Sequence, residues 1–206
     1  MAEEKKEPTK IKCPCCGELT LTQPLDVKSA VLDEYMAAII TGVPFSHTYS
    51  LFNGSVKIKV ESLNRADSTL ISDVARHLNE YAADKEGQAE GEGDVVTYIK
   101  ELAGVLRLYF GIISINMYKN DELVKTYSPS VVMREHAKNI AAAFRDGDEK
   151  ALAAIAAAVD VCLSQDVISS VPDAAIRTVV VTHGQLYNLL MEAGFDENFW
   201  EGIELA

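Results

Sequence analysis

The sequence has no apolar run that approaches the roughly 18–20 residues needed to cross a bilayer. Its polar start, Met-Ala-Glu-Glu-Lys-Lys-Glu, lacks the apolar stretch of a signal peptide, so we expect a cytoplasmic protein. The motifs of nucleophile elbows, zinc-protease helices, phosphate-binding loops and dinucleotide folds are also missing. Together these absences favour a non-enzymatic protein that does not contact membranes.

Basic charge is scarce as well. The 206 residues include 19 Lys and Arg against 31 Asp and Glu, a formal net charge of −12. Binding to nucleic acid or to an anionic membrane requires clustered Lys and Arg, so this balance argues against both partners. The acidic excess suits solubility and a basic protein partner.

The four cysteines do not form the pattern of a disulfide framework, because three of them crowd into Cys13-Pro-Cys15-Cys16-Gly17. Cys13 and Cys16 have the spacing of a zinc knuckle, and Cys15 is a weaker candidate ligand. A closed zinc site needs four ligands, and a second Cys pair is absent. Three interpretations stay open: a half-ribbon without metal, a Zn²⁺ site completed from elsewhere, and a redox dithiol. The cofactor is therefore either none or Zn²⁺. We expect Cys162 to lie in the core.

The hydrophobic pattern predicts an α+β fold that is mostly α, a helical bundle carrying at least one β-hairpin. The predicted divisions are a disordered tail (1–12), a Cys knuckle with a short strand (13–25), an α-rich main domain (26–194) and an acidic aromatic end (195–206). Within the main domain, the Gly- and Glu-rich stretch 85–94 is typical of a flexible surface loop or of a hinge.

Residues 45–62 carry the clearest local pattern. Apolar and polar residues alternate on both sides of Asn53-Gly54, the preferred pair for a two-residue type I′ turn. That turn fixes the register, and the expected pairs are Leu51 with Val56, Tyr49 with Ile58 and His47 with Val60. In this register the apolar side chains share one face of the hairpin and the lysines share the other.

A second hairpin is predicted over residues 113–127, where two alternating stretches flank the turn at 119–122. The competing interpretation continues the preceding helix, which begins at Val95, as far as Tyr118. The rest of the main domain is predicted to be helical, with starts at Asp26, Asp67 or Ser68, Ser128-Pro129, Asp148 and Ser170 to Pro172. Gly42 is expected to end the first helix. Inward-facing residues are expected to include Ile39, Leu152 and His183.

Asp73 and His77 lie four residues apart on one predicted helix, a spacing that could serve acid–base chemistry. Rows of this kind are usually solvated helix faces, and the enzymatic hypothesis requires that both side chains line a cleft. His47 falls on the apolar face of the first hairpin and is interpreted as a hydrogen-bonded or edge histidine.

The C-terminal segment is the best candidate for contact with a partner. Its large apolar residues stand among acidic residues and no basic ones: Phe195, Phe199, Trp200 and Ile203. Aromatic anchors with a charged rim suit a peptide that docks into a groove on a basic partner. The alternative is that the segment folds back onto this protein's own core.

The stretch Tyr-Ser-Leu-Phe-Asn-Gly-Ser-Val-Lys-Ile-Lys-Val-Glu-Ser-Leu at 49–63 resembles the hairpin of tailed-bacteriophage tail assembly chaperones and related baseplate assembly proteins. Residues 107–116 and the closing helix that ends in Asp-Glu-Asn-Phe-Trp are similar to the corresponding parts of that family. The resemblance implies a non-enzymatic virion assembly protein in the host cytoplasm, either released or retained in the virion. Its implied partners are other phage structural proteins, such as the tape measure or tail and baseplate components.

The alternative function is a zinc-knuckle adaptor that contacts nucleic acid through the knuckle and the nearby basic residues Lys5, Lys6, Lys10 and Lys12. This hypothesis depends on metal content and the first depends on protein partners, so the two are separable by experiment.

Overall fold

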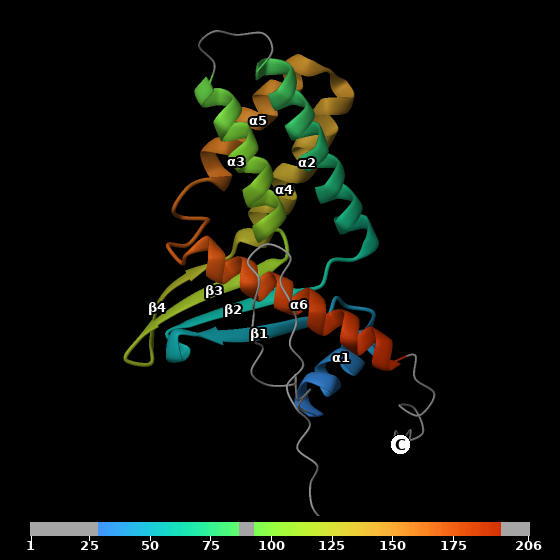
Figure 1. Cartoon of the computed structure of the whole chain (residues 1–206), viewed down its shortest axis with the longest axis vertical. Helices are drawn as coiled ribbons and strands as arrows, with labels where there is room; N and C mark the ends of the chain where they lie inside the picture. Colours follow the sequence, from blue (N-terminus) through green and yellow to red (C-terminus); the bar gives the residue numbers. More distant parts are fainter. Residues whose placement is uncertain (1–28, 87–92, 195–206) are drawn as a thin grey trace, which may run out of the picture.

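The computed structural model describes residues 29–86 and 93–194, and it confirms an α+β fold that is mostly helical. Four helices form an upright bundle, and a four-stranded sheet with two further helices lies at its lower end (Figure 1). The elements in chain order are α1 (Ser29–Thr41), β1 (Ser46–Leu51), the 3-10 turn η1 (Phe52–Gly54), β2 (Val56–Glu61), α2 (Arg65–Glu86), α3 (Gly93–Tyr109), β3 (Ile112–Lys119), β4 (Glu122–Tyr127), α4 (Pro129–Asp146), α5 (Asp148–Cys162) and α6 (Asp173–Gly194).

The first hairpin has the predicted register, with Leu51 opposite Val56 and Tyr49 opposite Ile58. Its turn has positive φ at Asn53 (55°) and at Gly54 (90°), as a type I′ turn requires. A two-residue turn at Asn53-Gly54 would leave Phe52 as the last residue of β1. Phe52 also has a positive φ, 51°, so β1 ends one residue earlier, at Leu51.

The second hairpin is confirmed, and the alternative of a helix reaching Tyr118 is wrong. Strand β3 pairs with β4 around a two-residue turn in which Asn120 and Asp121 have φ of 52° and 63°. Strand β3 also pairs with β2, so that Ile58 lies opposite Ile115 and the two hairpins form one antiparallel sheet. Both residues are fully buried, which gives the sheet its covered face.

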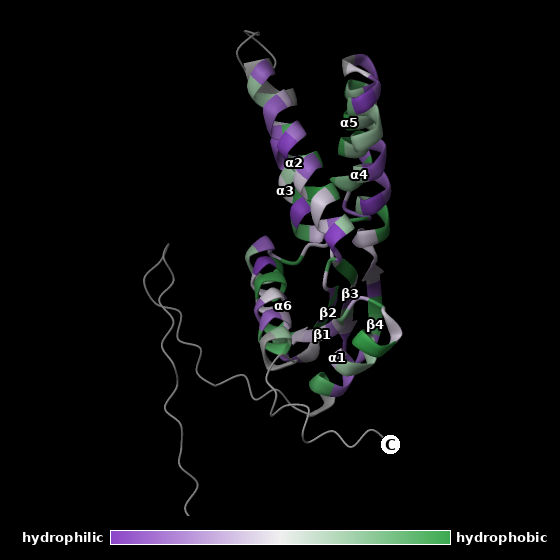
Figure 2. Ribbon diagram, turned by 90° about the vertical axis from the view of Figure 1, so that its right-hand side faces the viewer, coloured by the Kyte–Doolittle hydropathy of each residue, from purple (hydrophilic) through white to green (hydrophobic). Residues whose placement is uncertain are grey.

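Helices α2 to α5 pack as two adjacent antiparallel pairs, and their apolar stripes share one core with the covered face of the sheet (Figures 1 and 2). Fully buried members of that core include Leu78, Leu102, Met133 and Ile140. No helix in the described part of the chain is long and apolar enough to cross a membrane.

The predicted start of α2 is wrong by a few residues. The helix begins at Arg65, and Asn64 is its cap, because the Asn64 side-chain oxygen accepts a hydrogen bond of 2.8 Å from the backbone N–H of Asp67. Asp67 therefore lies in the first turn, where a carboxylate is stabilised by the positive end of the helix dipole.

The starts of α4 and α5 differ from the predicted caps as well. Pro129 occupies the first turn as predicted, but the Ser128 side chain makes no capping hydrogen bond. Helix α5 begins at Asp148, preceded by Gly147, whose φ of 119° turns the chain sharply. Gly147 serves both helices, because its N–H donates to the carbonyl of Ala143 and its own carbonyl accepts from the N–H of Ala151.

Two large apolar residues predicted to face inward are exposed. Leu152 is 46% exposed, because α5 turns the stripe containing Ala151, Ile155 and Cys162 toward the core instead. Small alanines on that stripe let α5 approach its neighbours closely. Ile39 is 50% exposed although it lies one turn beyond the buried Tyr35 on the same side of α1.

Helix α6 crosses one face of the sheet, and α1 lies near the C-terminal part of α6 (Figures 1 and 2). A second, smaller apolar cluster forms where α1, α6 and the start of β1 meet, and it consists of Tyr35, Ala38, Phe45, Leu186 and Leu190. The predicted segments 1–12, 13–25 and 195–206, and residues 87–92 of the predicted loop 85–94, lie outside the described residues.

Candidate functional site

The main candidate site is a half-open groove between α1 and α6, next to the smaller apolar cluster. Its volume is about 490 Å³, within the range of ordinary ligand and peptide pockets. The groove is lined by Tyr35, Ala38, Ile39 and Gly42 of α1 and its end, by Val43, Pro44 and Phe45 before β1, by Ser62, Leu63 and Asn64 after β2, and by Tyr187 and Met191 of α6. We call it the α1–α6 groove.

The walls of the α1–α6 groove are aromatic. Tyr35 meets Phe45 edge to face, with ring centres 5.7 Å apart, and meets Tyr187 in the same way at 6.2 Å. Gly42 has a φ of 67°, which ends α1 and lets the chain turn toward Phe45. The local sequence therefore builds this wall by stopping one helix and starting a strand within a few residues.

The mouth of the groove exposes apolar side chains. Ile39 is half exposed, Val43 is 57% exposed and Met191 is 36% exposed. Because these three residues line one cavity, they form a contiguous apolar surface rather than scattered single residues. Exposed apolar surface that gathers in this way is typical of interaction sites, which makes the groove the main candidate site.

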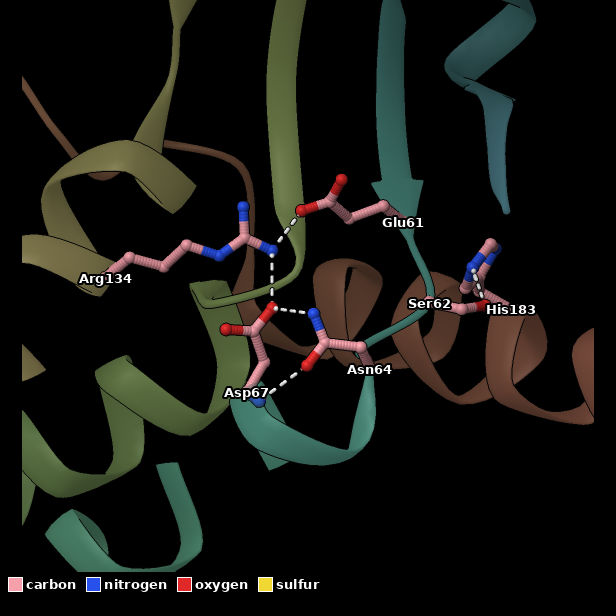
Figure 3. Close-up of polar contacts among 6 residues, drawn as sticks. All are labelled: Glu61, Ser62, Asn64, Asp67, Arg134 and His183. Carbon is pink, nitrogen blue, oxygen red and sulfur yellow. Dashed lines mark hydrogen bonds and ion pairs between the residues drawn. The ribbon is translucent and has the colours of Figure 1, made fainter. Parts of the chain in front are cut away.

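Behind the groove lies a buried histidine, His183 of α6, which is only 3% exposed. Its Nδ1 is 3.1 Å from the hydroxyl of Tyr49, and its Nε2 is 3.0 Å from the hydroxyl of Ser62 (the latter contact is drawn in Figure 3). The ring also stacks on Phe45, with centres 5.3 Å apart. Burial, and to a lesser extent the charge of His47, lower the pKa of His183 to about 4.

The Ser62–His183 pair has the outline of a nucleophile and a base, with Tyr49 in the orienting position. Two features make it a weak catalytic unit. A histidine whose pKa is lowered to about 4 is a poor acceptor for the serine proton at neutral pH. Burial also raises the pKa of Tyr49 to about 12, so the third group is a neutral phenol rather than a carboxylate. The arrangement suits a fixed anchor that holds α6 against β1 at Tyr49 and against Ser62, the residue that follows β2.

A second polar cluster joins the bundle to the sheet at Arg134 of α4. Its guanidinium contacts the carboxylates of Glu61 at the end of β2 and, at 3.5 Å, of Asp67 in α2 (Figure 3). Asn64 donates a further hydrogen bond of 3.1 Å to Asp67, and the guanidinium lies over the Phe110 ring at 5.4 Å. One arginine therefore connects α4, β2 and α2, which fixes the segment 62–64 that forms one side of the α1–α6 groove.

The predicted acid–base pair is not brought together with either cluster. Asp73 is exposed and lies 3.8 Å from Arg76 on the same helix, and His77 packs against Phe144. The described cavities are lined by other residues. His47 Nδ1 lies at hydrogen-bond distance, 2.9 Å, from a carboxylate oxygen of Glu34 in α1, which agrees with the interpretation of His47 as a hydrogen-bonded or edge histidine.

The predicted metal ligands Cys13 and Cys16, with Cys15, lie outside the described residues, as do Phe195, Phe199, Trp200 and Ile203. Cys162 is buried in the core as predicted, and burial raises the pKa of its thiol to about 12. Within residues 29–86 and 93–194, no group of three or more His, Cys, Asp or Glu side chains is placed to hold a metal ion.

Sequence reasoning missed Ser62, Tyr49 and Arg134 as site residues. The apolar stripe did place His183 inside the protein, but its partners lie more than a hundred positions away in the chain. No local pattern could have connected them.

Comparison with known protein families, curated proteins and solved structures finds no match for this chain.

Proposed function

We propose that this chain is a non-enzymatic protein-binding module that acts in the assembly of a tailed-phage virion in the host cytoplasm. In this proposal the α1–α6 groove takes an apolar segment of a tail or baseplate component, such as the tape measure. The proposal rests on the resemblance of the first hairpin and closing helix to tail assembly chaperones and on the chemistry of the groove.

The observation that carries the proposal is the apolar mouth of the groove. Ile39, Val43 and Met191 lie around one cavity of about 490 Å³ and leave much of their surface exposed. Burying such surface contributes about 25 cal/mol for each Å², so an apolar segment of a partner would gain stabilisation there. Aromatic walls add edge-to-face contacts for an aromatic or aliphatic anchor.

Charge favours a basic segment as the occupant. The whole chain has a formal net charge of −12, and α1, which forms one wall of the groove, carries Asp33 and Glu34 with no basic residue. A partner segment with apolar anchors and flanking Lys or Arg would gain from this field, mainly in its rate of association.

The test is co-expression with the virion proteins encoded beside this chain, and solubility and co-purification are measured. An Ile39→Glu variant places a charge in the groove mouth and is expected to abolish co-purification. Ile40→Glu is the matched control, because Ile40 is 78% exposed on the same helix and does not line the groove. If no neighbouring virion protein becomes more soluble or co-purifies with the natural chain, the proposal is wrong.

A further inference from the structure

The α1–α6 groove has a candidate occupant within the same chain. We propose that the segment 195–206, which directly follows α6, docks its aromatic side chains into the groove, and that a partner must displace it. The inference rests on the proposed function in one respect, namely that the groove is the site where a partner binds. The segment would then regulate that site by occupying it until a partner arrives.

Chain continuity favours this occupant. Helix α6 supplies Tyr187 and Met191 to the groove and ends at Gly194. Met191 and Gly194 are separated by three residues, about 4.5 Å of helix rise. Phe199 follows Gly194 by five residues, which can span at most about 18 Å. Phe199 and Trp200 can therefore reach the groove without any rearrangement of the described helices.

The chemistry of the segment matches that of the groove. Its large apolar residues are Phe195, Phe199, Trp200 and Ile203. An aromatic side chain buries about 150–250 Å² when it docks, and it prefers edge-to-face contact with other rings. Tyr35, Phe45 and Tyr187 present such rings around the cavity. Docking would also cover the exposed apolar mouth, which otherwise remains in water.

The tether favours the chain's own segment over the same segment of a second copy. A short covalent connection gives the attached group an effective concentration in the millimolar range. A second copy competes only at its bulk concentration, which is far lower in a dilute solution. Occupancy of the groove by the chain's own segment is therefore independent of protein concentration. Occupancy by a second copy would depend on it, so a dilution series distinguishes the two.

An occupied groove lowers the apparent affinity for a partner by the fraction of time that the groove is open. The four acidic residues of the segment (Asp196, Glu197, Glu201 and Glu204) gain nothing from the acidic α1, so the docked state depends on the apolar anchors alone. A basic partner segment with similar anchors would gain both the burial of its apolar anchors and the attraction to the acidic α1. This difference would let a partner displace the segment and keep weaker apolar peptides out.

Trp200 makes the inference directly measurable, because it is the single tryptophan of the chain. In the free, full-length protein, we expect a blue-shifted emission maximum and a lower acrylamide quenching constant than in the urea-unfolded chain. Ile39→Glu is expected to raise the quenching constant to about the unfolded value. Ile40→Glu is the matched control and should leave it as in the natural chain. Val43→Glu is a second variant at the mouth, with far-UV circular dichroism reporting that each variant is folded.

Three results would overturn the inference. The first is a Trp200 that is quenched as strongly in the folded chain as in urea. The second is an equal effect of Ile39→Glu and Ile40→Glu. The third is shielding that disappears on dilution, which would assign the contact to a second copy. Because this experiment contains no partner, its outcome is independent of the co-expression test, so failure of either proposal can be recognised separately.

Discussion

Protonation of His183 is expected to weaken the contact between α6 and the sheet. The ring is buried, and it lies between the hydroxyls of Tyr49 and Ser62 and against the face of Phe45. None of these groups carries a negative charge that could stabilise an imidazolium. The charge of His47 also opposes protonation of His183 and adds to the larger effect of burial. Replacement of His183 by Gln keeps polar atoms at this place and removes the titration.

The size of the expected loss of stability follows from the pKa of His183, which is about 4 in the folded protein and 6.5 for an ordinary histidine. Since the folded pKa is lowered, the unfolded chain binds the proton more readily, and stability falls as the pH drops through 6.5 toward 4. The difference of about 2.5 pKa units corresponds to about 3 kcal/mol in full. Proton linkage predicts that the free energy of unfolding falls by about 2 kcal/mol between about pH 7 and about pH 5.

Urea unfolding followed by circular dichroism at a series of pH values measures this loss, provided that the m-value stays constant. The free energy of unfolding of the natural chain includes the titration of His183, and that of His183→Gln does not. The difference between their free energies of unfolding, followed against pH, therefore gives the contribution of His183. His136→Gln, which keeps His183, is the matched control and should retain the acid-linked loss. If the natural chain and His183→Gln lose the same free energy of unfolding over this range, the reasoning about the buried histidine is wrong.

Three other predictions concern stability and use the same urea assay. Arg134→Ala should cost about 2–3 kcal/mol, because it removes the cation shared by two partly buried carboxylates, whereas Arg76→Ala on the exposed face of α2 should cost less than about 0.5 kcal/mol. Equal effects would refute a structural role for the Arg134 cluster. Ile58→Ala should cost about 3–4 kcal/mol, since this side chain is fully buried between sheet and helices, and a cost below about 1 kcal/mol would contradict that packing. Gly42→Ala should destabilise the protein by about 1 kcal/mol, because the φ of Gly42 is 67°. Gly104→Ala should stabilise α3 by up to about 1 kcal/mol, because an added Cβ there meets nothing within 4 Å. Effects of the same sign for the two variants would overturn the argument.

The hairpins show what a local pattern can predict. Asn53-Gly54 and the alternation around it set the pairing of Leu51 with Val56, and the structure has that pairing. A turn of two residues leaves few alternative registers, and a slip would expose every apolar side chain of the hairpin. Pairing of β2 with β3 was not predicted, because more than fifty residues separate Ile58 from Ile115 and no turn chemistry connects them.

The helices show where local patterns stop being informative. The Ala-rich α5 offers two neighbouring stripes of similar hydrophobicity, and packing against the bundle selected the one with Ala151 rather than Leu152. Asn64 was overlooked as the cap of α2 because Asp67 and Ser68 are equally good capping residues by type. In both cases several residues satisfy the local preference, and contacts with other elements decide among them.

By itself, the sequence determined most of the described helices, the first hairpin with its register and the buried position of His183, because periodicity, turn residues and apolar stripes act over a few neighbouring residues. It left residues 113–118 open between a helix and a strand. Only the tertiary structure decided that His183 meets Tyr49 and Ser62, that Arg134 meets Glu61 and Asp67, and that α1 and α6 form a groove. These contacts join positions far apart in the chain, and they depend on how whole elements pack. The candidate site depends mainly on such contacts, which is why the sequence predicted the fold class but did not reveal the groove.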